Sequence, residues 1–170
     1  AVAGCLEWAL AQNDDAAFQR AARALGEDLA QEPVRVEGRI AELFSDLPPG
    51  SEIPAGLLAA LASGARQEAV KRWREAVAHY QIALERWADA PVGSISAWRY
   101  AGDRIGRIIE TAGADAYREQ EQAAGRLLAE ATQKGDVEGL RAILRGYPQS
   151  KAVEKAYLEL ARRLLADGRD

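Results

Sequence analysis

Histidine and cysteine, two side chains that often act as general bases, nucleophiles or metal ligands, are scarce in this 170-residue sequence. It has one histidine, His79, and one cysteine, Cys5, and the two are far apart along the chain. A zinc or transition-metal site needs several Cys, His or carboxylate ligands at close spacing, which neither residue has. His79 has the chemistry of a general acid or base, but a packing or surface histidine is the simpler interpretation. We therefore expect no metal ion and no cofactor.

Cys5 would need a neighbouring base to act as a nucleophile. It lies between Gly4 and Leu6 in a segment of helical periodicity, where we expect a small, buried and unreactive side chain. Residues 2–5 (Val-Ala-Gly-Cys) also resemble the cleavage motif of bacterial lipoproteins, and this alternative stays open.

The other patterns that could bind a ligand are short. Gly102 and Gly106 are four residues apart inside a segment of helical period. No strand is expected before them and no Gly-Lys-Ser/Thr follows, so they lack the context of a phosphate-binding loop. Paired carboxylates such as Asp14 and Asp15 point to different sides of a helix and do not converge by themselves. We therefore expect that the protein is not an enzyme.

Composition favours a globular helical protein. Apolar residues make up 48% and charged residues 28% of the chain, a balance typical of a folded domain. Alanine dominates the apolar residues, and adjacent β-branched residues are almost absent, which favours helix over sheet. The formal net charge is −4, so the basic surface of a nucleic-acid binder is missing. No apolar stretch reaches the roughly 18 residues of a transmembrane helix.

Helical periodicity runs through every long segment of the sequence, and apolar residues repeat at spacings of three and four. The longest such stripe consists of Trp73, Val77, Tyr80, Leu84 and Trp87, which we expect to be buried against neighbouring helices. The periodicity predicts about nine helices joined by short loops, and no strands.

Capping residues and prolines set the expected helix boundaries. The expected helix starts are Asp14 or Asp15, Pro33, Pro54, Ser94, Asp136 and Ser150. Residues 46–54, with three prolines and a glycine, are expected to form a loop. The helix that begins at Pro54 is expected to end at Ser63 and Gly64. The last helix is expected to bury Val153, Tyr157, Leu160 and Leu164 on one face.

Residues 135–170 resemble a tetratricopeptide (TPR) repeat. Gly135-Asp136 precedes one helix, and the turn Tyr147-Pro148-Gln149-Ser150 leads into the next. Residues 73–80 (WREAVAHY) are also similar to the second helix of a TPR repeat. The resemblance implies an all-α fold of antiparallel helical hairpins stacked as a TPR-like right-handed superhelix. It implies divergent N-terminal hairpins over residues 1–50 and TPR-like repeats over residues 51–170, continuous with the first part and truncated at the C-terminal end.

Residues 65–170 further resemble the helical domain of planctomycete-type envelope proteins that also carry a quinoprotein-like β-propeller. The shared order runs from the Trp73 helix through the break at Pro91 to Ala116-Tyr117-Arg118 and Tyr147-Pro148. Residues 1–64 lie outside this resemblance. It implies a bacterial protein that is periplasmic or outer-membrane-associated, and no other feature of the sequence indicates a compartment.

Aromatic residues suggest where a partner would bind. Trp98, Arg99 and Tyr100 are consecutive, so one face of a helix cannot bury all three. Aromatic and arginine side chains are enriched at interface hot spots. We therefore expect Trp98, Arg99 and Tyr100 to contact a protein partner or another domain of the same polypeptide. Two functions stay open: a non-catalytic protein–protein interaction scaffold, and a structural subunit of a large envelope or membrane-associated complex.

Overall fold

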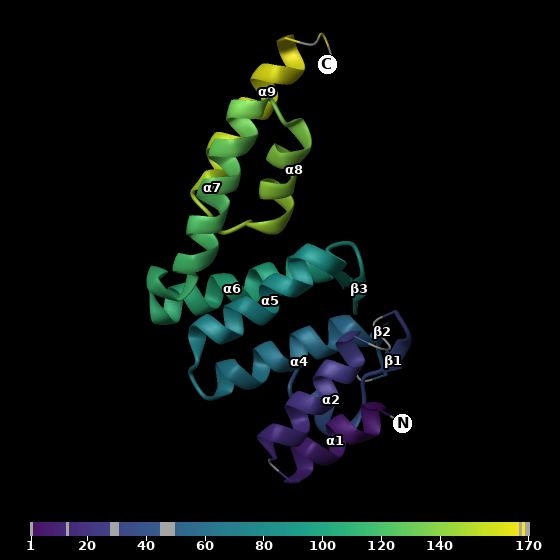
Figure 1. Ribbon diagram of the computed structural model, residues 1–170. Coiled ribbons are helices and arrows are strands. Elements are labelled where there is room, and N and C mark those ends of the chain that lie inside the picture. Colours follow the sequence, from purple (N-terminus) through teal and green to yellow (C-terminus); the bar gives the residue numbers. More distant parts are fainter. Residues whose placement is uncertain (1, 13, 28–30, 45–49, 167, 169–170) are drawn as a thin grey trace. The chain divides into compact units, whose positions relative to one another are not determined.

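The structure is a computed structural model, and it describes residues 2–12, 14–27, 31–44, 50–166 and 168. Within these residues it contains nine α-helices, one 3₁₀-helix and two small β-ribbons (Figure 1), so the expected all-α fold with about nine helices is confirmed. The chain divides into two compact units, Ala1–Arg104 and Ile105–Asp170. The two units are defined by the contacts within each of them. The expected boundary between divergent hairpins over residues 1–50 and TPR-like repeats over residues 51–170 stays a prediction.

The first unit contains most of the helices. Its elements are α1 (Val2–Gln12), α2 (Asp15–Glu27), β1 (Pro33–Arg35), α3 (Gly38–Glu42), β2 (Glu52–Pro54), α4 (Ala55–Ala69), α5 (Trp73–Trp87), β3 (Pro91–Val92), β4 (Ile95–Ser96) and the first half of α6 (Ala97–Ala112). The second unit contains the rest of α6, η1 (Ala114–Tyr117), α7 (Arg118–Lys134), α8 (Val137–Gly146) and α9 (Ala152–Ala166). In the first unit α1 packs against α2, and α4 contacts both α2 and α5.

The central helix of the first unit is α4. All of its residues from Ala55 to Ala65 are buried, because a helix of alanine and leucine is apolar on every side. The expected end at Ser63 and Gly64 is wrong, since α4 continues to Ala69. A Cβ atom at Gly64 would lie only 2.7 Å from Cε1 of the Tyr80 ring. This glycine therefore marks a close contact between α4 and α5, and not a helix end.

The side chain of α5 that meets this glycine belongs to the predicted apolar stripe. Val77 and Tyr80 are fully buried, Leu84 is 1% exposed and Trp87 is 8% exposed. Trp73, the first member, is half-buried. The stripe thus packs into the core as its spacing predicts.

Two aspartates cap helices as the sequence predicts. Asp14 Oδ1 accepts a hydrogen bond from the backbone N–H of Ala17 at 2.9 Å, and Asp136 Oδ1 accepts one from Gly139 at 2.9 Å. Each carboxylate thereby satisfies a free N–H group in the first turn of its helix. Gly135 ends α7 in the left-handed conformation, with φ 73°, which glycine adopts without steric cost.

Two antiparallel ribbons replace segments that we expected to be helical or loop. A helix is expected to begin at Pro33, but residues Pro33–Arg35 form the strand β1. This strand pairs with β2 through Val34 and Ile53. Only Gly38–Glu42 is helical in this region. The expected loop over residues 46–54 lies partly outside the described residues, and its last three residues form β2. Pro33 fits the edge of a short strand as well as the first turn of a helix, so the sequence alone was ambiguous here.

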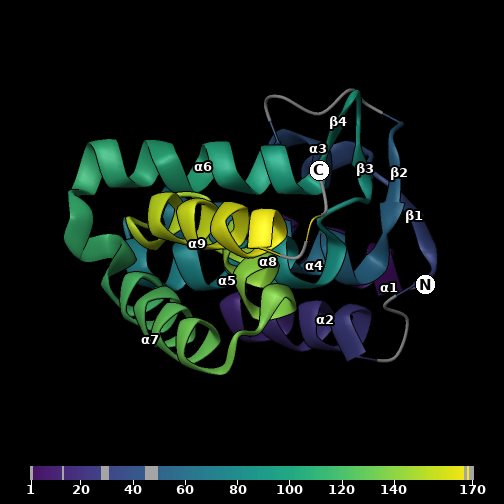
Figure 2. The same cartoon turned by 90° about the horizontal axis from the view of Figure 1, so that it is seen from above.

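The second ribbon shifts the start of α6. β3 pairs with β4 through Val92 and Ile95, so Ser94 lies in the connection between strands and does not cap a helix. Ser96 Oγ instead accepts a hydrogen bond from the N–H of Arg99 at 3.3 Å. The two ribbons lie next to each other in the first unit (Figure 2).

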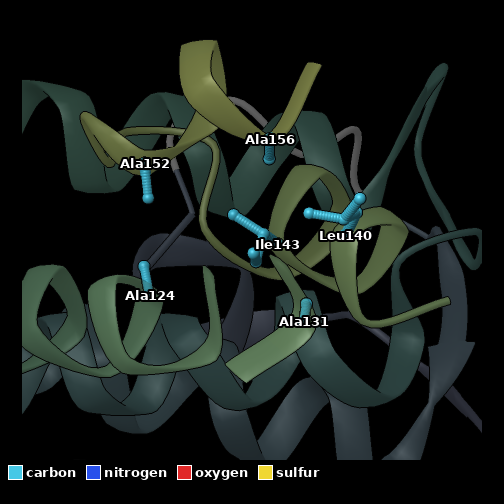
Figure 3. Packing of buried hydrophobic residues seen from close by; sticks show 6 residues of the cluster. All are labelled: Ala124, Ala131, Leu140, Ile143, Ala152 and Ala156. Carbon is cyan, nitrogen blue, oxygen red and sulfur yellow. The ribbon is translucent and has the colours of Figure 1, made fainter. Parts of the chain in front are cut away.

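The second unit packs α7, α8 and α9 around a small core. Its buried members are Ala124, Ala131, Leu140, Ile143, Ala152 and Ala156 (Figure 3). Ser150 Oγ accepts a hydrogen bond from the N–H of Ala152 at 3.0 Å, which confirms the expected start of the last helix. The prediction of which α9 residues face the core is partly wrong. Val153 and Leu160 pack against the core, but Tyr157 is 59% exposed because the small Ala156 takes the inward position.

Candidate functional site

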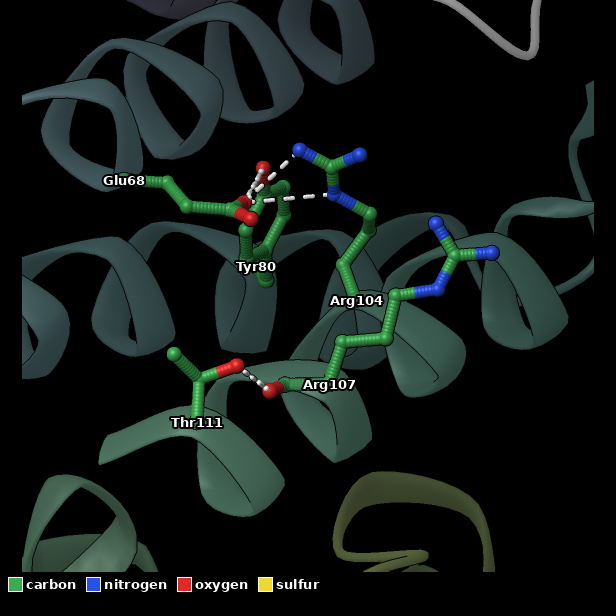
Figure 4. Close-up of polar contacts among 5 residues, drawn as sticks. All are labelled: Glu68, Tyr80, Arg104, Arg107 and Thr111. Carbon is green, nitrogen blue, oxygen red and sulfur yellow. Dashed lines mark hydrogen bonds and ion pairs between the residues drawn. The ribbon is translucent and has the colours of Figure 1, made fainter. Parts of the chain in front are cut away.

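A polar cluster joins α4, α5 and α6 inside the first unit (Figure 4). Glu68 Oε2 accepts hydrogen bonds from Tyr80 Oη at 2.9 Å, Arg104 Nη2 at 2.8 Å and Arg104 Nε at 3.2 Å. The Arg104 and Glu68 side chains are only 15% and 22% exposed. Burial raises the pKa of the Tyr80 phenol far above its ordinary value, and Arg104 opposes this rise. A phenol that stays protonated and a carboxylate that already accepts three hydrogen bonds are suited to holding helices together and not to proton transfer.

A cleft of about 450 Å³ opens between α2, α4 and α5 of the first unit. Its volume falls within the range of about 300–1,000 Å³ that is typical of ligand sites. The cleft exists because small residues face one another where α2 passes α4. A Cβ atom at Gly26 of α2 would meet the Cβ of Ala59 of α4 at 4.0 Å. Ala22 and Ala60 also line this floor, so the floor of the cleft is apolar and lies close to the backbone.

Larger side chains from α5 form the wall of the cleft. Ile82 is 37% exposed and Trp87 is 8% exposed, and both line the cleft. The indole Nε1–H of Trp87 is buried and donates to no acceptor among the described residues. The wall therefore offers apolar contact area to a bound group.

The rim of the cleft is positively charged. Arg20, Arg23 and Arg86 line it, and Glu27 is the one acidic residue in the described part of its lining. Glu27 lies 3.9 Å from Arg23 in an exposed i,i+4 pair. Arg20 and Arg86 form no ion pair with any residue that the structure describes. In a chain of net charge −4, this rim is a local concentration of positive charge.

His79 is half-buried in the wall of the same cleft. Burial lowers its pKa below the ordinary value and so favours the neutral ring, and Glu75 opposes this shift. Ser63 also lines the cleft, but no hydrogen bond between it and His79 is found among the contacts of the described residues. A nucleophile activated by a base requires such a bond. The geometry of the cleft supports binding better than catalysis.

The three residues predicted to contact a partner lie in the first turn of α6. Arg99 is exposed and Trp98 is half-buried. Tyr100 is only 5% exposed, and its ring packs edge-on against Phe44 with the ring centroids 6.4 Å apart. At least one exposed member was expected, and Arg99 is that member. Tyr100 belongs to the core, so a contact at this place would use Arg99 and part of Trp98, and it stays a prediction.

A second surface, which the sequence does not predict, lies on α9. Tyr157 is 59%, Leu158 55% and Leu165 73% exposed, and Ala161 between them is exposed as well. We call these four residues the α9 stripe. One of the four, Tyr157, is expected from the sequence to be buried, because large apolar residues normally point inward. No burial is predicted from the sequence for Leu158, Ala161 or Leu165.

Cys5 is exposed, so the expectation of a buried side chain is wrong. The inward face of α1 is formed by Leu6 and Ala9, which are fully buried. Across the described part of the chain, no group of three or more His, Cys, Asp and Glu side chains is placed to hold a metal ion. None of the described helices is both long and apolar enough to cross a membrane.

Comparison with known proteins identifies no relative of this chain. No protein-family model matches the chain, and neither a curated protein nor a solved structure gave a match. The resemblances to TPR repeats and to envelope proteins therefore stay predictions, and the function has to be argued from the geometry of the molecule.

Proposed function

We propose that this chain is a non-catalytic protein–protein interaction scaffold built from TPR-like helical repeats. The observation that carries the proposal is the α9 stripe, where Tyr157, Leu158 and Leu165 are each more than half exposed. Single exposed apolar residues are common, but several on one helix face mark an interaction site. Full burial of one such side chain is worth roughly 1.5–3 kcal/mol, so a partner that covers this face gains a substantial driving force.

The proposal includes the stacking of helical hairpins as a TPR-like right-handed superhelix. It is supported by the succession of α7, α8 and α9, in which each helix packs against the other two. The helices are separated by short turns at residues 135–136 and 147–151. Such successions expose one face of each helix to partners.

The test uses three forms of the chain as immobilised bait in an extract of the native source. One is wild type, one carries Tyr157→Gln, Leu158→Gln and Leu165→Gln, and one carries Glu138→Gln and Arg141→Gln. The last is a matched control, because Glu138 and Arg141 are exposed on α8 and their joint replacement leaves the net charge unchanged. We expect wild type and control to retain the same protein in similar amounts and the stripe variant to lose it. Equal retention by all three baits, or retention by none, would contradict the proposal.

A structural subunit of a large envelope or membrane-associated complex is the second candidate. It is favoured by exposed apolar side chains away from α9. In the first unit Trp8 is 56%, Val70 59% and Ile82 37% exposed. An obligate subunit buries apolar area permanently and on several faces. The two functions differ in the lifetime of the complex, which is measured by adding excess unlabelled chain to the captured complex. Exchange within minutes supports a scaffold, and no exchange over hours supports an obligate subunit.

A further inference from the structure

We propose that the cleft between α2, α4 and α5 binds an acidic segment of a partner protein in which Asp or Glu residues alternate with a large apolar residue. This proposal rests on the scaffold function proposed above and assigns a second surface to it, distinct from the α9 stripe. The rim of the cleft selects the charge of the segment, and its floor and wall select the apolar residue.

The charge of the rim determines which segments are attracted. Arg20 and Arg86 come from different helices and line the same opening, and neither is paired with a described residue. Glu27, the one acidic side chain among the described residues that line the rim, lies beside Arg23. Among the described lining residues positive charge therefore outweighs negative charge, which attracts a carboxylate and repels a lysine or arginine side chain. Such complementarity selects partners and speeds association.

The floor of the cleft distinguishes a peptide from a simple anion. At the floor, Gly26 of α2 has no side chain and Ala59 of α4 has only a methyl group. Ile82 offers an apolar side chain at the opening. A phosphate or sulfate ion would leave this apolar area in contact with water, whereas an apolar side chain of a peptide would cover it. The volume of about 450 Å³ suits a few side chains of a segment and not a whole domain.

The experiment selects peptides from a random peptide library displayed on phage, with the complete chain as immobilised target. The enriched peptides are synthesised with a fluorescent label, and their dissociation constants are measured by anisotropy. We expect the enriched sequences to be rich in Asp and Glu and to contain a large apolar residue. We also expect Arg20→Glu combined with Arg86→Glu to weaken binding by at least about tenfold, because two attractive charges become repulsive.

A matched control separates the cleft from net charge. Arg72→Glu combined with Arg126→Glu makes the same change of formal charge at exposed positions that do not line the cleft. This control is expected to bind the peptides as wild type does. Ile82→Gln keeps the charge and removes apolar area from the cleft, and it is expected to weaken binding several-fold. Circular dichroism and thermal melting confirm that each variant is folded.

Several outcomes would overturn the proposal. A library that yields no binder, or binders without acidic residues, excludes an acidic segment as the occupant. A simple anion site is indicated by three results together. The Arg20→Glu, Arg86→Glu variant binds the peptides more weakly, Ile82→Gln binds them as wild type does, and inorganic phosphate competes fully with them. A wild-type dimer in sedimentation that the Arg20→Glu, Arg86→Glu variant no longer forms assigns the cleft to a second copy of this chain.

A result that contradicts the cleft proposal can be distinguished from one that contradicts the scaffold function. Enriched peptides that bind wild type and the Arg20→Glu, Arg86→Glu variant equally would place their site elsewhere on the chain. The cleft proposal would then be wrong, while the scaffold function would stand. Loss of partner capture at the α9 stripe is measured independently and does not depend on the peptides.

Discussion

Gly64 lies within α4, where helix propensity alone predicts that alanine would stabilise the protein. The structure predicts the opposite for Gly64→Ala. An added Cβ atom would lie 2.7 Å from Cε1, 2.8 Å from Cζ and 2.9 Å from Cδ1 of the Tyr80 ring. Tyr80 is fully buried, and its hydroxyl donates to Glu68 at 2.9 Å. The ring therefore has no space to move into and loses a hydrogen bond if it turns.

The size of the effect follows from two opposing contributions. Alanine favours a helix interior over glycine by roughly 0.8–1.0 kcal/mol. Extra volume in a filled core costs typically about 1–3 kcal/mol, and a lost hydrogen bond to a charged acceptor costs a further amount of about 1.5–3 kcal/mol. Because the steric cost and the lost hydrogen bond together exceed the gain in propensity, we expect Gly64→Ala to lower the free energy of unfolding by roughly 1.5–5 kcal/mol.

Urea unfolding followed by circular dichroism measures this change. Gly4→Ala and Gly125→Ala are controls inside other helices, where an added Cβ has no heavy atom within 4 Å, and both are expected to be neutral or stabilising. In the background of Tyr80→Leu, which removes the ring, Gly64→Ala is expected to become much less harmful. If Gly64→Ala alone were as stable as wild type, the close contact between α4 and α5 would be refuted.

Three further predictions concern charged groups. Glu68→Gln leaves the partly buried Arg104 without its anionic partner, so we expect the free energy of unfolding to fall by about 1–3 kcal/mol in urea titrations. Asp136→Ala removes the N-cap of α8 and is expected to cost about 1 kcal/mol by the same measurement. His79 has a lowered pKa when folded, so the unfolded chain binds a proton first as the pH falls. Wild type should therefore lose stability relative to His79→Gln below about pH 6.5 and not above it, as urea titrations at several pH values will show.

Local signals in the sequence predict the helices well. Asp14 and Asp136 identify helix starts because a cap depends only on residues within one turn. The burial of the apolar stripe from Trp73 to Trp87 on α5 is predicted correctly, because its large apolar residues recur at helical spacing. Both kinds of signal are contained in short stretches of chain, so they need no knowledge of distant neighbours.

Features that depend on distant contacts are missed. β1 is a strand because it pairs with β2, and strands of three residues are too short to show alternation. The sequence predicts a helix end at Gly64, but the missing side chain there makes room for the Tyr80 ring of another helix. On α9 the small Ala156 faces inward and the larger Tyr157 faces outward, which reverses the usual relation between size and burial.

The candidate sites are even harder to predict, because they arise from packing between helices. Arg20 and Arg86 are far apart in the sequence, and only the fold brings them to the rim of one cleft. The expected contact at Trp98, Arg99 and Tyr100 followed from residue types alone. The structure places Tyr100 in the core, where Tyr100→Ala would leave a cavity that costs about 3–5 kcal/mol. A test of that surface should therefore change Trp98 and Arg99 only.

The most direct test of the scaffold function is titration calorimetry with the purified partner that wild type captures. The partner is titrated into wild type, into the Glu138→Gln, Arg141→Gln control, and into the variant with Gln at positions 157, 158 and 165. We predict one dissociation constant for wild type and control, and a value at least about tenfold weaker for the stripe variant, because apolar contact is lost at the interface. Equal dissociation constants for all three chains would contradict the account.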